Sequence, residues 1–191
     1  MFNDTSSTLA LLRTRRSGKP RDMIGPGPDA MQLRTMLEAA IRVPDHGKLA
    51  PWRFVVVGSD QRQRLADVLT GAYLAEKPEA GRLEIETMEQ FARQAPTLIV
   101  ALSTPVVDSK IPLWEQQLSV GAACMNLLTA AHASGFVSSW LTGWPTYSDV
   151  VRDAFGSPGE RIAGFIFIGS PGRALEERPR PDYDKVVINW G

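Results

Sequence analysis

A cluster of positive charge near the N-terminus is the first feature of the chain that could carry chemistry. Four cations fall within the seven residues Arg13-Thr14-Arg15-Arg16-Ser17-Gly18-Lys19. A planar guanidinium can hold phosphate oxygens through two parallel hydrogen bonds, and the hydroxyl of Ser17 adds a further donor. The same composition is also typical of a solvated helix end, where the helix dipole favours cations. The run therefore indicates either a phosphate site or an exposed helix terminus.

A second candidate is the segment from Ile41 to Val57, which combines a helix end, a polar loop and an apolar strand. The residue before Pro44 is disfavoured in helical backbone, so the preceding helix is predicted to end near Val43. Residues 52–57 are aromatic and β-branched, which predicts a buried strand. The loop between helix and strand contains His46 and Lys48. We expect this loop, together with the basic run, to hold an anionic cofactor.

Few other residues could act as an acid, a base or a nucleophile. His132 and Cys124 both lie in a long apolar helical pattern, where a structural role is favoured for each. His46 is evenly balanced between a surface residue and a ligand contact. No glycine-rich phosphate loop is present, and no catalytic side chain or metal ligand is assigned. This scarcity favours an enzyme whose chemistry belongs to a cofactor.

Composition predicts one ordinary globular domain spanning residues 1–191, with a flexible lead at residues 1–7. Hydrophobic residues make up 43% of the chain, charged residues 22%, and the formal net charge is +0. A neutral chain offers no field that would attract nucleic acid or an anionic membrane. A single cysteine and the absence of a signal-peptide pattern predict a cytoplasmic location. The only biased segment is the tail near Glu176 to Pro181, which is rich in proline and arginine.

Hydrophobic periodicity predicts a mixture of helices and strands. Several helices follow one another between strands, which favours α+β layers over a strictly alternating parallel sheet. We expect the helix at 113–134 to be a core helix, a dimer seam or both, because it is apolar on most sides. The terminal residues 186–190 resemble a strand that could add to another subunit's sheet edge. The remaining expected elements are a helix carrying Leu9 and Leu12, a helix from 29 to about 43 with an Asp29–Gln32 capping box, a helix from 60 to 77 capped by Asp60, a charged peripheral helix at 79–94, a short helix at 148–155, a loop at 142–145, and strands at 52–57, 97–102, 136–141 and 161–168.

Five short motifs, taken in order, resemble the nitroreductase family of flavoproteins and, within it, the small YdjA-like branch. Each motif alone is weak, but the ordered set is specific and covers almost the whole chain. The motifs are Arg15-Arg16-Ser17-x-Lys19, Pro44-Asp45-His46 with Pro51-Trp52-Arg53-Phe54, Trp114-Glu115-Gln116, Gly135-Phe136 with Trp140-x-Thr142-Gly143, and Gly164-Phe165 with Gly169-x-Pro171.

This resemblance implies a fold and an activity. The fold would be a layered α+β sandwich, with a mostly antiparallel central sheet flanked by helices, in an intertwined homodimer. The C-terminal extension at 178–191 would reach the partner subunit. One FMN per subunit would lie at the dimer interface. NADH or NADPH would give a hydride to flavin N5 and leave, after which a nitroaromatic, a quinone or a similar acceptor would take the electrons.

The resemblance also assigns roles to individual positions. Arg15, Arg16 and Ser17 would hold the FMN phosphate and ribityl chain, and Lys19 would lie near flavin N1 and O2. Arg42 and His46 would come from the other subunit. Trp140, Leu141 and Thr142 would line the ring through backbone groups, and Arg173 would be a second phosphate contact. Close relatives tend to carry an arginine in place of Leu141, which affects the expected acceptor more than FMN binding.

Two other hypotheses remain open at this point. The chain could be a dimeric flavin-binding protein without turnover, used for storage or sensing. It could also be an unrelated α+β binding protein in which the arginine run is only a helix end. The residues name neither the acceptor nor the preferred nicotinamide coenzyme.

Overall fold

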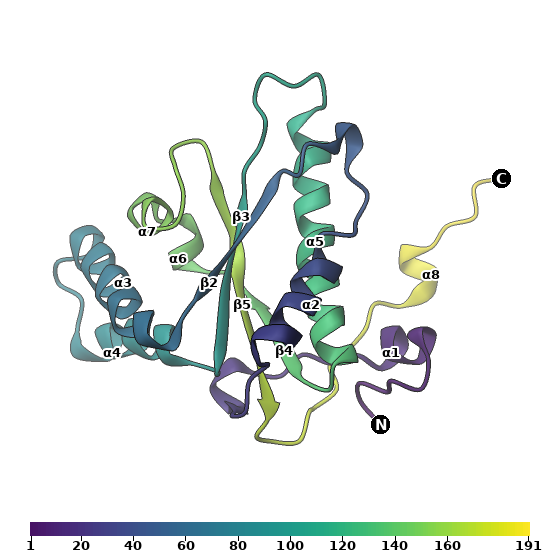
Figure 1. Cartoon of the computed structure of the whole chain (residues 1–191), viewed down its shortest axis with the longest axis horizontal. Coiled ribbons are helices and arrows are strands. Elements are labelled where there is room, and N and C mark those ends of the chain that lie inside the picture. The colour runs from purple at the N-terminus through teal and green to yellow at the C-terminus, as the bar shows by residue number, and fades with distance from the viewer.

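A five-stranded antiparallel sheet lies between two helical layers in the computed structural model, which describes residues 1–191 (Figure 1). The strand order is β1-β5-β3-β2, and β4 also pairs with β5. Every pairing is antiparallel. The predicted α+β architecture is therefore confirmed. The strands are β1 (Met23–Ile24), β2 (Trp52–Val57), β3 (Thr97–Ser103), β4 (Val137–Leu141) and β5 (Arg161–Pro171).

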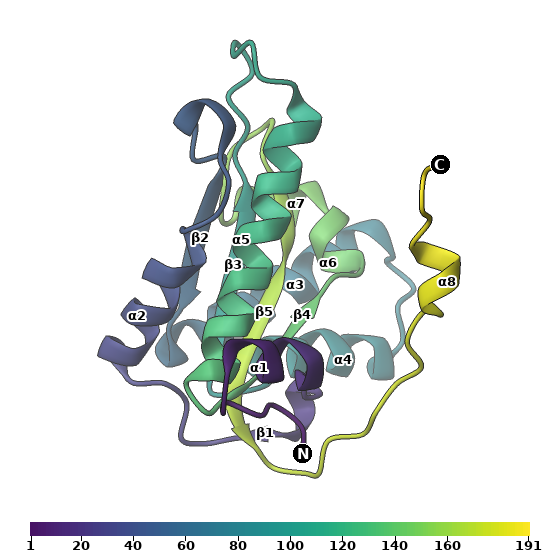
Figure 2. The same ribbon diagram turned by 90° about the vertical axis from the view of Figure 1, so that its right-hand side faces the viewer.

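The two helical layers cover opposite faces of the sheet (Figure 1). One face carries α2 (Ala30–Ala40) and α5 (Leu113–Ala133). The other face carries α3 (Arg62–Glu76), α4 (Arg82–Arg93), α6 (Trp144–Tyr147) and α7 (Asp149–Asp153). The N-terminal α1 (Thr8–Thr14) lies beside the end of α5, and α8 (Tyr183–Val186) stands away from both layers (Figures 1 and 2). Three short 3₁₀ turns complete the chain, at Pro20–Asp22, His46–Lys48 and Ser59–Gln61.

The central strands β3 and β5 are buried on both faces, and their side chains alternate between two cores. Leu98, Phe165 and Phe167 point into the core under α3 and α4. Ile99 and Ile166 point into the core under α2 and α5. A strand covered on both sides must be apolar at every position, which explains the continuous apolar runs that made these two strands visible in the sequence.

Helix α4 was expected at the periphery, and that prediction is wrong for its C-terminal half. Ala92 is 0% exposed. Phe91 makes edge-to-face contacts with Phe165 and Phe167, with ring centroids 5.0 Å and 5.4 Å apart. The outer face of the helix is charged, but its inner face forms part of the core. The many charged residues of this segment made its apolar inner face hard to identify from the sequence.

The C-terminal end of α4 is held by a buried guanidinium. Arg62 Nη1 donates to the carbonyl oxygens of Ala92 at 2.9 Å and Gln94 at 3.2 Å. Its Nη2 donates to the carbonyls of Ala95 at 3.5 Å and Pro96 at 3.3 Å. Carbonyls at a helix end have no partner within the helix and carry the negative end of its dipole. Arg62 therefore neutralises a helix terminus that would otherwise be buried without partners.

The structure confirms the capping box that begins α2. Gln32 N donates to Asp29 Oδ1 at 2.8 Å, and Asp29 N donates to Gln32 Oε1 at 3.0 Å. The expected cap by Asp60 is wrong, because a 3₁₀ turn at 59–61 precedes α3 and no side chain caps that helix. The Asp60 carboxylate instead accepts a hydrogen bond from Gln61 Nε2 at 3.1 Å.

Three further expectations differ from the structure. The expected loop at 142–145 contains the start of α6, because proline is tolerated in the first turn of a helix. The strand expected at 186–190 is absent from this chain, where α8 ends at Val186 and the remaining residues are irregular. The two-residue β1 was not predicted, because it depends on pairing with residues near 170, far away in the sequence. None of the helices combines the length and the hydropathy needed to cross a membrane.

Candidate functional site

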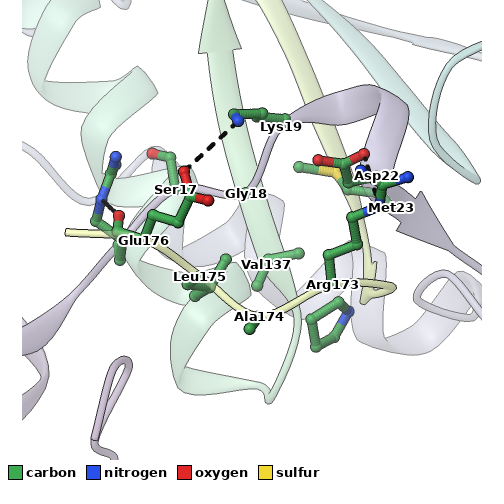
Figure 3. Close-up of a pocket in the computed structure, with 12 residues that line it drawn as sticks. Ser17, Gly18, Lys19, Asp22, Met23, Val137, Arg173, Ala174, Leu175 and Glu176 are labelled. Carbon is green, nitrogen blue, oxygen red and sulfur yellow. Dashed lines mark hydrogen bonds and ion pairs between the residues drawn. The ribbon is translucent and has the colours of Figure 1, made fainter. Parts of the chain in front are cut away.

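The basic run forms one wall of a small cavity beside the sheet (Figure 3). After α1 the backbone becomes extended and carries residues 16–19 along this wall. The segment that follows β5, residues 173–176, forms the opposite wall, and Val137 of β4 lies between them. The cavity has a volume of about 100 Å³. Segments more than 150 positions apart in the sequence therefore meet here, as Arg16 and Glu176 do in their hydrogen bond.

Two local features hold the basic run in place. A Cβ added to Gly18 would lie 3.0 Å from Val137 Cγ2, so glycine lets the run pack closely against β4. Arg16 N donates to Asn3 Oδ1 at 2.7 Å, and Asp4 N donates to Thr14 Oγ1 at 2.9 Å. The lead at residues 1–7, which was expected to be loose, thus makes hydrogen bonds to the run and to α1.

Carboxylates of the C-terminal segment pair weakly with the basic run. Lys19 Nζ lies 3.8 Å from Glu176 Oε2, and Arg16 Nε lies 3.8 Å from Glu177 Oε1. Arg16 Nε also donates to the backbone carbonyl of Glu176 at 2.5 Å. On the other side of the cavity, Arg173 Nε lies 3.5 Å from Asp22 Oδ1. Each of these long ion pairs has at least one exposed partner and so contributes little to stability, which means that a stronger anion could replace the carboxylates.

Arg15 has the most unusual environment in the run. Its Nε is buried and has no hydrogen-bond partner. Burial lowers the pKa of its guanidinium, and the positive charges of Arg180, Arg16 and Arg178 lower it further. A donor left without an acceptor among like charges is costly unless an anion binds there. The residues that gather here, Arg15, Arg16, Arg178 and Arg180, are referred to below as the cationic cluster.

Sequence reasoning missed Arg178 and Arg180. Both lie in the proline- and arginine-rich tail that was treated only as a biased segment. The available signal was a second pair of arginines in a chain of zero net charge. Nothing in the local pattern shows that this tail returns to the N-terminal run, because the return depends on β5.

The structure places His46 far from the cationic cluster, whereas Arg42 lies beside the C-terminal half of α5, where its carbonyl accepts from Asn126 Nδ2. The turn between α2 and β2 lies at the N-terminal end of α5, whereas α1 lies at its C-terminal end (Figures 1 and 2). His46 contacts Glu115 in the first turn of α5. Arg15 lies near His132 in the last turn, where its charge lowers the pKa of the imidazole. The helix between residues 115 and 132 spans about 25 Å at its ordinary rise. One chain therefore does not bring the two predicted groups together.

The side chains of Trp140 and Leu141 are committed to packing. The Trp140 indole crosses Gly164, where any Cβ would overlap it, and its Nε1 donates to the Ala163 carbonyl at 3.0 Å. Leu141 packs on the opposite face of the sheet, against the core under α3 and α4. Thr142 is exposed. The side chains of the two strand residues are used by the fold, so only their backbone groups remain for a ligand.

His132 and Cys124 are buried in α5, which confirms their predicted structural roles. Burial raises the pKa of the Cys124 thiol to about 12. Burial, followed by the charge of Arg15, lowers the pKa of His132 from 6.5 to about 4. The unfolded chain therefore takes up a proton at this histidine at a higher pH than the folded chain does. The contribution of His132 to stability is present above pH 6.5 and is lost as the pH falls towards 4.

The comparisons with known proteins define the family. Residues 12–170 match the model of the nitroreductase family, so the chain belongs to that family. It is 37% identical over 95% of its length to a Haemophilus influenzae protein described as "Putative NAD(P)H nitroreductase", 98% of which is covered. It is 35% identical over 85% of its length to "Putative NAD(P)H nitroreductase YdjA" of Escherichia coli, 87% of which is covered. The predicted resemblance to the family and its YdjA-like branch is confirmed.

Solved structures support the same fold. A nitroreductase-like family protein from Bacillus cereus superposes with a TM-score of 0.84 at 21% identity, covering 97% of each chain. A Sphigopyxis sp. nitroreductase described as FMN- and NADPH-dependent superposes with a TM-score of 0.76 at 17% identity, covering 97% of this chain and 99% of that one. At these identities the likeness concerns the fold.

Proposed function

We propose that this chain is an FMN-dependent NAD(P)H oxidoreductase that works as a homodimer. The observation that carries the proposal is the cationic cluster around the buried, unpartnered Nε of Arg15. Membership of a family with NAD(P)H nitroreductase relatives supports the reaction class. The solved FMN- and NADPH-dependent relative of the same fold supports the choice of flavin.

The residues of the cluster fit the phosphate of FMN. A phosphate dianion would give Arg15 Nε its missing acceptor and would relieve the repulsion among the arginines. Arg16 and Ser17 would bind the same phosphate and the ribityl chain beside it. Arg173 lines the cavity that Arg16 and Ser17 also line, and it would be a further phosphate contact. When bound, FMN supplies the hydride chemistry that no side chain of this chain provides.

Lys19 would contribute electrostatics at the flavin ring. Its side chain is more than half exposed, and its ammonium group has only the 3.8 Å contact with Glu176. We assign it to the N1 and O2 edge of the ring, where negative charge develops on reduction. The backbone of Trp140, Leu141 and Thr142 would line the ring, since the two strand side chains are held by the core.

The proposal requires a second copy of the chain. The cavity beside the cluster, at about 100 Å³, is well below the 300 to 1,000 Å³ of ordinary ligand pockets. Arg42 and His46 would be supplied by the partner. Within one chain His46 lies at the opposite end of α5, and Arg42 lies beside Asn126 in the C-terminal half of that helix. Arg178 and Arg180 stay near Arg15 of their own chain, and the rest of the C-terminal extension at 178–191 would reach the partner. Large apolar side chains exposed near these regions would be covered in the dimer: Leu9, Leu12, Met31, Ile41, Trp114, Leu118, Tyr183, Val186, Ile188 and Trp190.

The reaction that we propose has two halves. NADH or NADPH reduces the bound flavin and leaves, and a nitroaromatic, a quinone or a similar acceptor is then reduced in the same place. The protein binds and orients the flavin and keeps one face open to one substrate at a time. A cytoplasmic location is part of the same proposal. The alternative is a flavin-binding dimer without turnover.

The decisive experiment begins with the absorbance of the purified protein. A flavin spectrum released on denaturation supports the cofactor, and a colourless protein that takes up no added FMN refutes it. Anaerobic NADH and NADPH are then added separately. Bleaching of the flavin followed by recovery on adding a nitroaromatic supports the enzyme, whereas a bound flavin that neither coenzyme bleaches supports the binding protein. Sedimentation of the holoprotein tests the dimer.

A further inference from the structure

A polar stripe on α5 holds the segment from α2 to the His46 turn. Its members, Glu115, Ser119 and Asn126, are spaced so that they share one face of the helix. Ser119 Oγ donates to the Pro44 carbonyl at 2.5 Å. Asn126 Nδ2 donates to the carbonyls of Ala39 and Arg42, both at 3.1 Å. Glu115 is the one member of the stripe that contacts a side chain, since its Oε2 lies 2.7 Å from His46 Nδ1.

The backbone around His46 is fixed without Glu115. The Asp45 carboxylate accepts from Leu49 N at 3.2 Å and from Ala50 N at 2.8 Å. Gly47 has a φ of +78°, which disfavours any residue with a side chain, and a Cβ there would lie 3.1 Å from Ile111 Cγ1. The contact with Glu115 is therefore not needed to form the turn. Its effect falls on the imidazole ring.

A carboxylate only accepts hydrogen bonds, so the ring nitrogen that faces it must carry a proton. The contact thus selects the form of His46 with a proton on Nδ1 and directs Nε2 away from α5. In such a pair the hydrogen bond at one ring nitrogen determines what the other nitrogen can do. Here Nε2 is left to accept from a ligand when the ring is neutral, or to donate when it is charged.

We propose that Glu115 is a positioning residue that fixes the ring of His46, so that Nε2 faces the flavin held by the partner subunit. This inference rests on the proposed function, because it takes His46 to contact FMN across the dimer. It adds a residue and a role that the proposed site did not contain. Flavin affinity would then depend on a carboxylate that never touches the flavin.

Glu115 also has a structural role that must be separated from this one. It lies in the first turn of α5, where a carboxylate is favoured by the helix dipole. That contribution does not depend on His46. Combining substitutions at both positions therefore distinguishes the two roles, because only the positioning role disappears when the imidazole is absent.

The first experiment measures FMN dissociation from the diluted holoprotein by the rise in flavin fluorescence. We expect Glu115→Ala to raise the dissociation constant about fivefold and His46→Ala to raise it about tenfold, the size of one ordinary hydrogen bond. In the His46→Ala background, Glu115→Ala should change the constant by less than about twofold. An equal effect of Glu115→Ala in both backgrounds would assign it a structural role and overturn the inference. Glu38→Ala removes an exposed carboxylate that pairs with Arg34 on α2 and is the matched control, expected to change nothing.

The second experiment does not depend on flavin. With only two histidines in the chain, ¹⁵N NMR of the full-length protein can assign both rings by comparison with His46→Ala. At a pH where the ring is neutral, wild-type His46 should carry its proton on Nδ1. In Glu115→Ala it should shift towards the Nε2–H form that free histidine prefers. The Nε2–H form in the wild-type protein would overturn the inference.

The two proposals fail in different ways. If the protein binds no FMN, the proposed function fails, and the NMR result still reports whether Glu115 orients the ring. If FMN is bound and lost on substitution of Arg15, but Glu115→Ala has no effect that depends on His46, the proposed function stands and the positioning role is refuted.

Discussion

The most informative perturbation is Arg15→Met, because the structure predicts weaker flavin binding without a loss of stability. The Nε of Arg15 is buried without a partner and faces the charges of Arg178 and Arg180. Methionine preserves much of the apolar stem while removing both the unsatisfied donor and the charge. In the flavin-free protein this substitution therefore removes a penalty and breaks no hydrogen bond.

The expected magnitudes follow from this environment. A charge-assisted hydrogen bond contributes about 1.5 to 3 kcal/mol, so losing the contact with the phosphate should weaken FMN binding about 10- to 100-fold. Relief of the unsatisfied donor should leave the free energy of unfolding of the apoprotein unchanged or raise it by about 1 kcal/mol. FMN binding should therefore weaken without any loss of apoprotein stability.

The assay combines FMN titration, followed by quenching of flavin fluorescence, with urea unfolding of the flavin-free protein. Arg13→Met is the matched control, since Arg13 belongs to the same basic run but is exposed in the last turn of α1. It should alter neither quantity. Unchanged FMN affinity in Arg15→Met would refute the phosphate assignment. A loss of apoprotein stability above about 1 kcal/mol would show that Arg15 is held by contacts within the fold.

Three further predictions concern the scaffold. Gly164→Ala should lower the free energy of unfolding by about 2 kcal/mol, because the added methyl group would displace the Trp140 indole. Gly71→Ala is the contrast: open space surrounds Gly71 in α3, so this change should raise the free energy of unfolding by about 0.5 kcal/mol, and urea denaturation of both variants measures the difference. As the pH falls from 6.5 to 4, the stability advantage of the wild type over His132→Gln should shrink by up to about 3 kcal/mol, and a constant difference would contradict the lowered pKa. Arg62→Met should destabilise the protein by about 2 to 3 kcal/mol, because it leaves the carbonyls at the end of α4 without a donor. Arg64 is exposed, so Arg64→Met is the control and should change the urea midpoint little.

The elements that the sequence predicted well are those whose patterns are local. The bounds of the strand at 52–57 and the capping box at Asp29 and Gln32 were predicted as observed, since the residues that make them lie side by side in the chain. The expectation that this strand is buried is wrong, because β2 is an edge strand in which only Val57 is buried. The core helix at 113–134 was equally clear, because its own small and apolar residues cover most of its circumference. The missed elements depend on distant partners. Strand β1 exists only through β5, and the buried side of α4 is defined by Phe165 and Phe167.

The same distinction applies to the candidate site. The residue types of the basic run suggested an anion site, but composition left an exposed helix end equally possible. The structure adds the unpartnered Nε of Arg15 and the proximity of Arg178 and Arg180, which no local pattern contains. The roles of Arg42 and His46 came from the family resemblance. They remain predictions, because one chain alone leaves His46 at the far end of α5.

The position of β5 in the sheet has a consequence for how the chain reaches its fold. This strand pairs with β1, β3 and β4, and it is the last of the five to leave the ribosome. Until residues 161–171 appear, the apolar strand β3 has a partner on one edge only. Pairings between segments so distant in sequence form slowly, and until they form the backbone groups at the edge of β3 stay unpaired and can pair with another chain. The protein is therefore most prone to aggregation while the chain is being synthesised, before the sheet is complete.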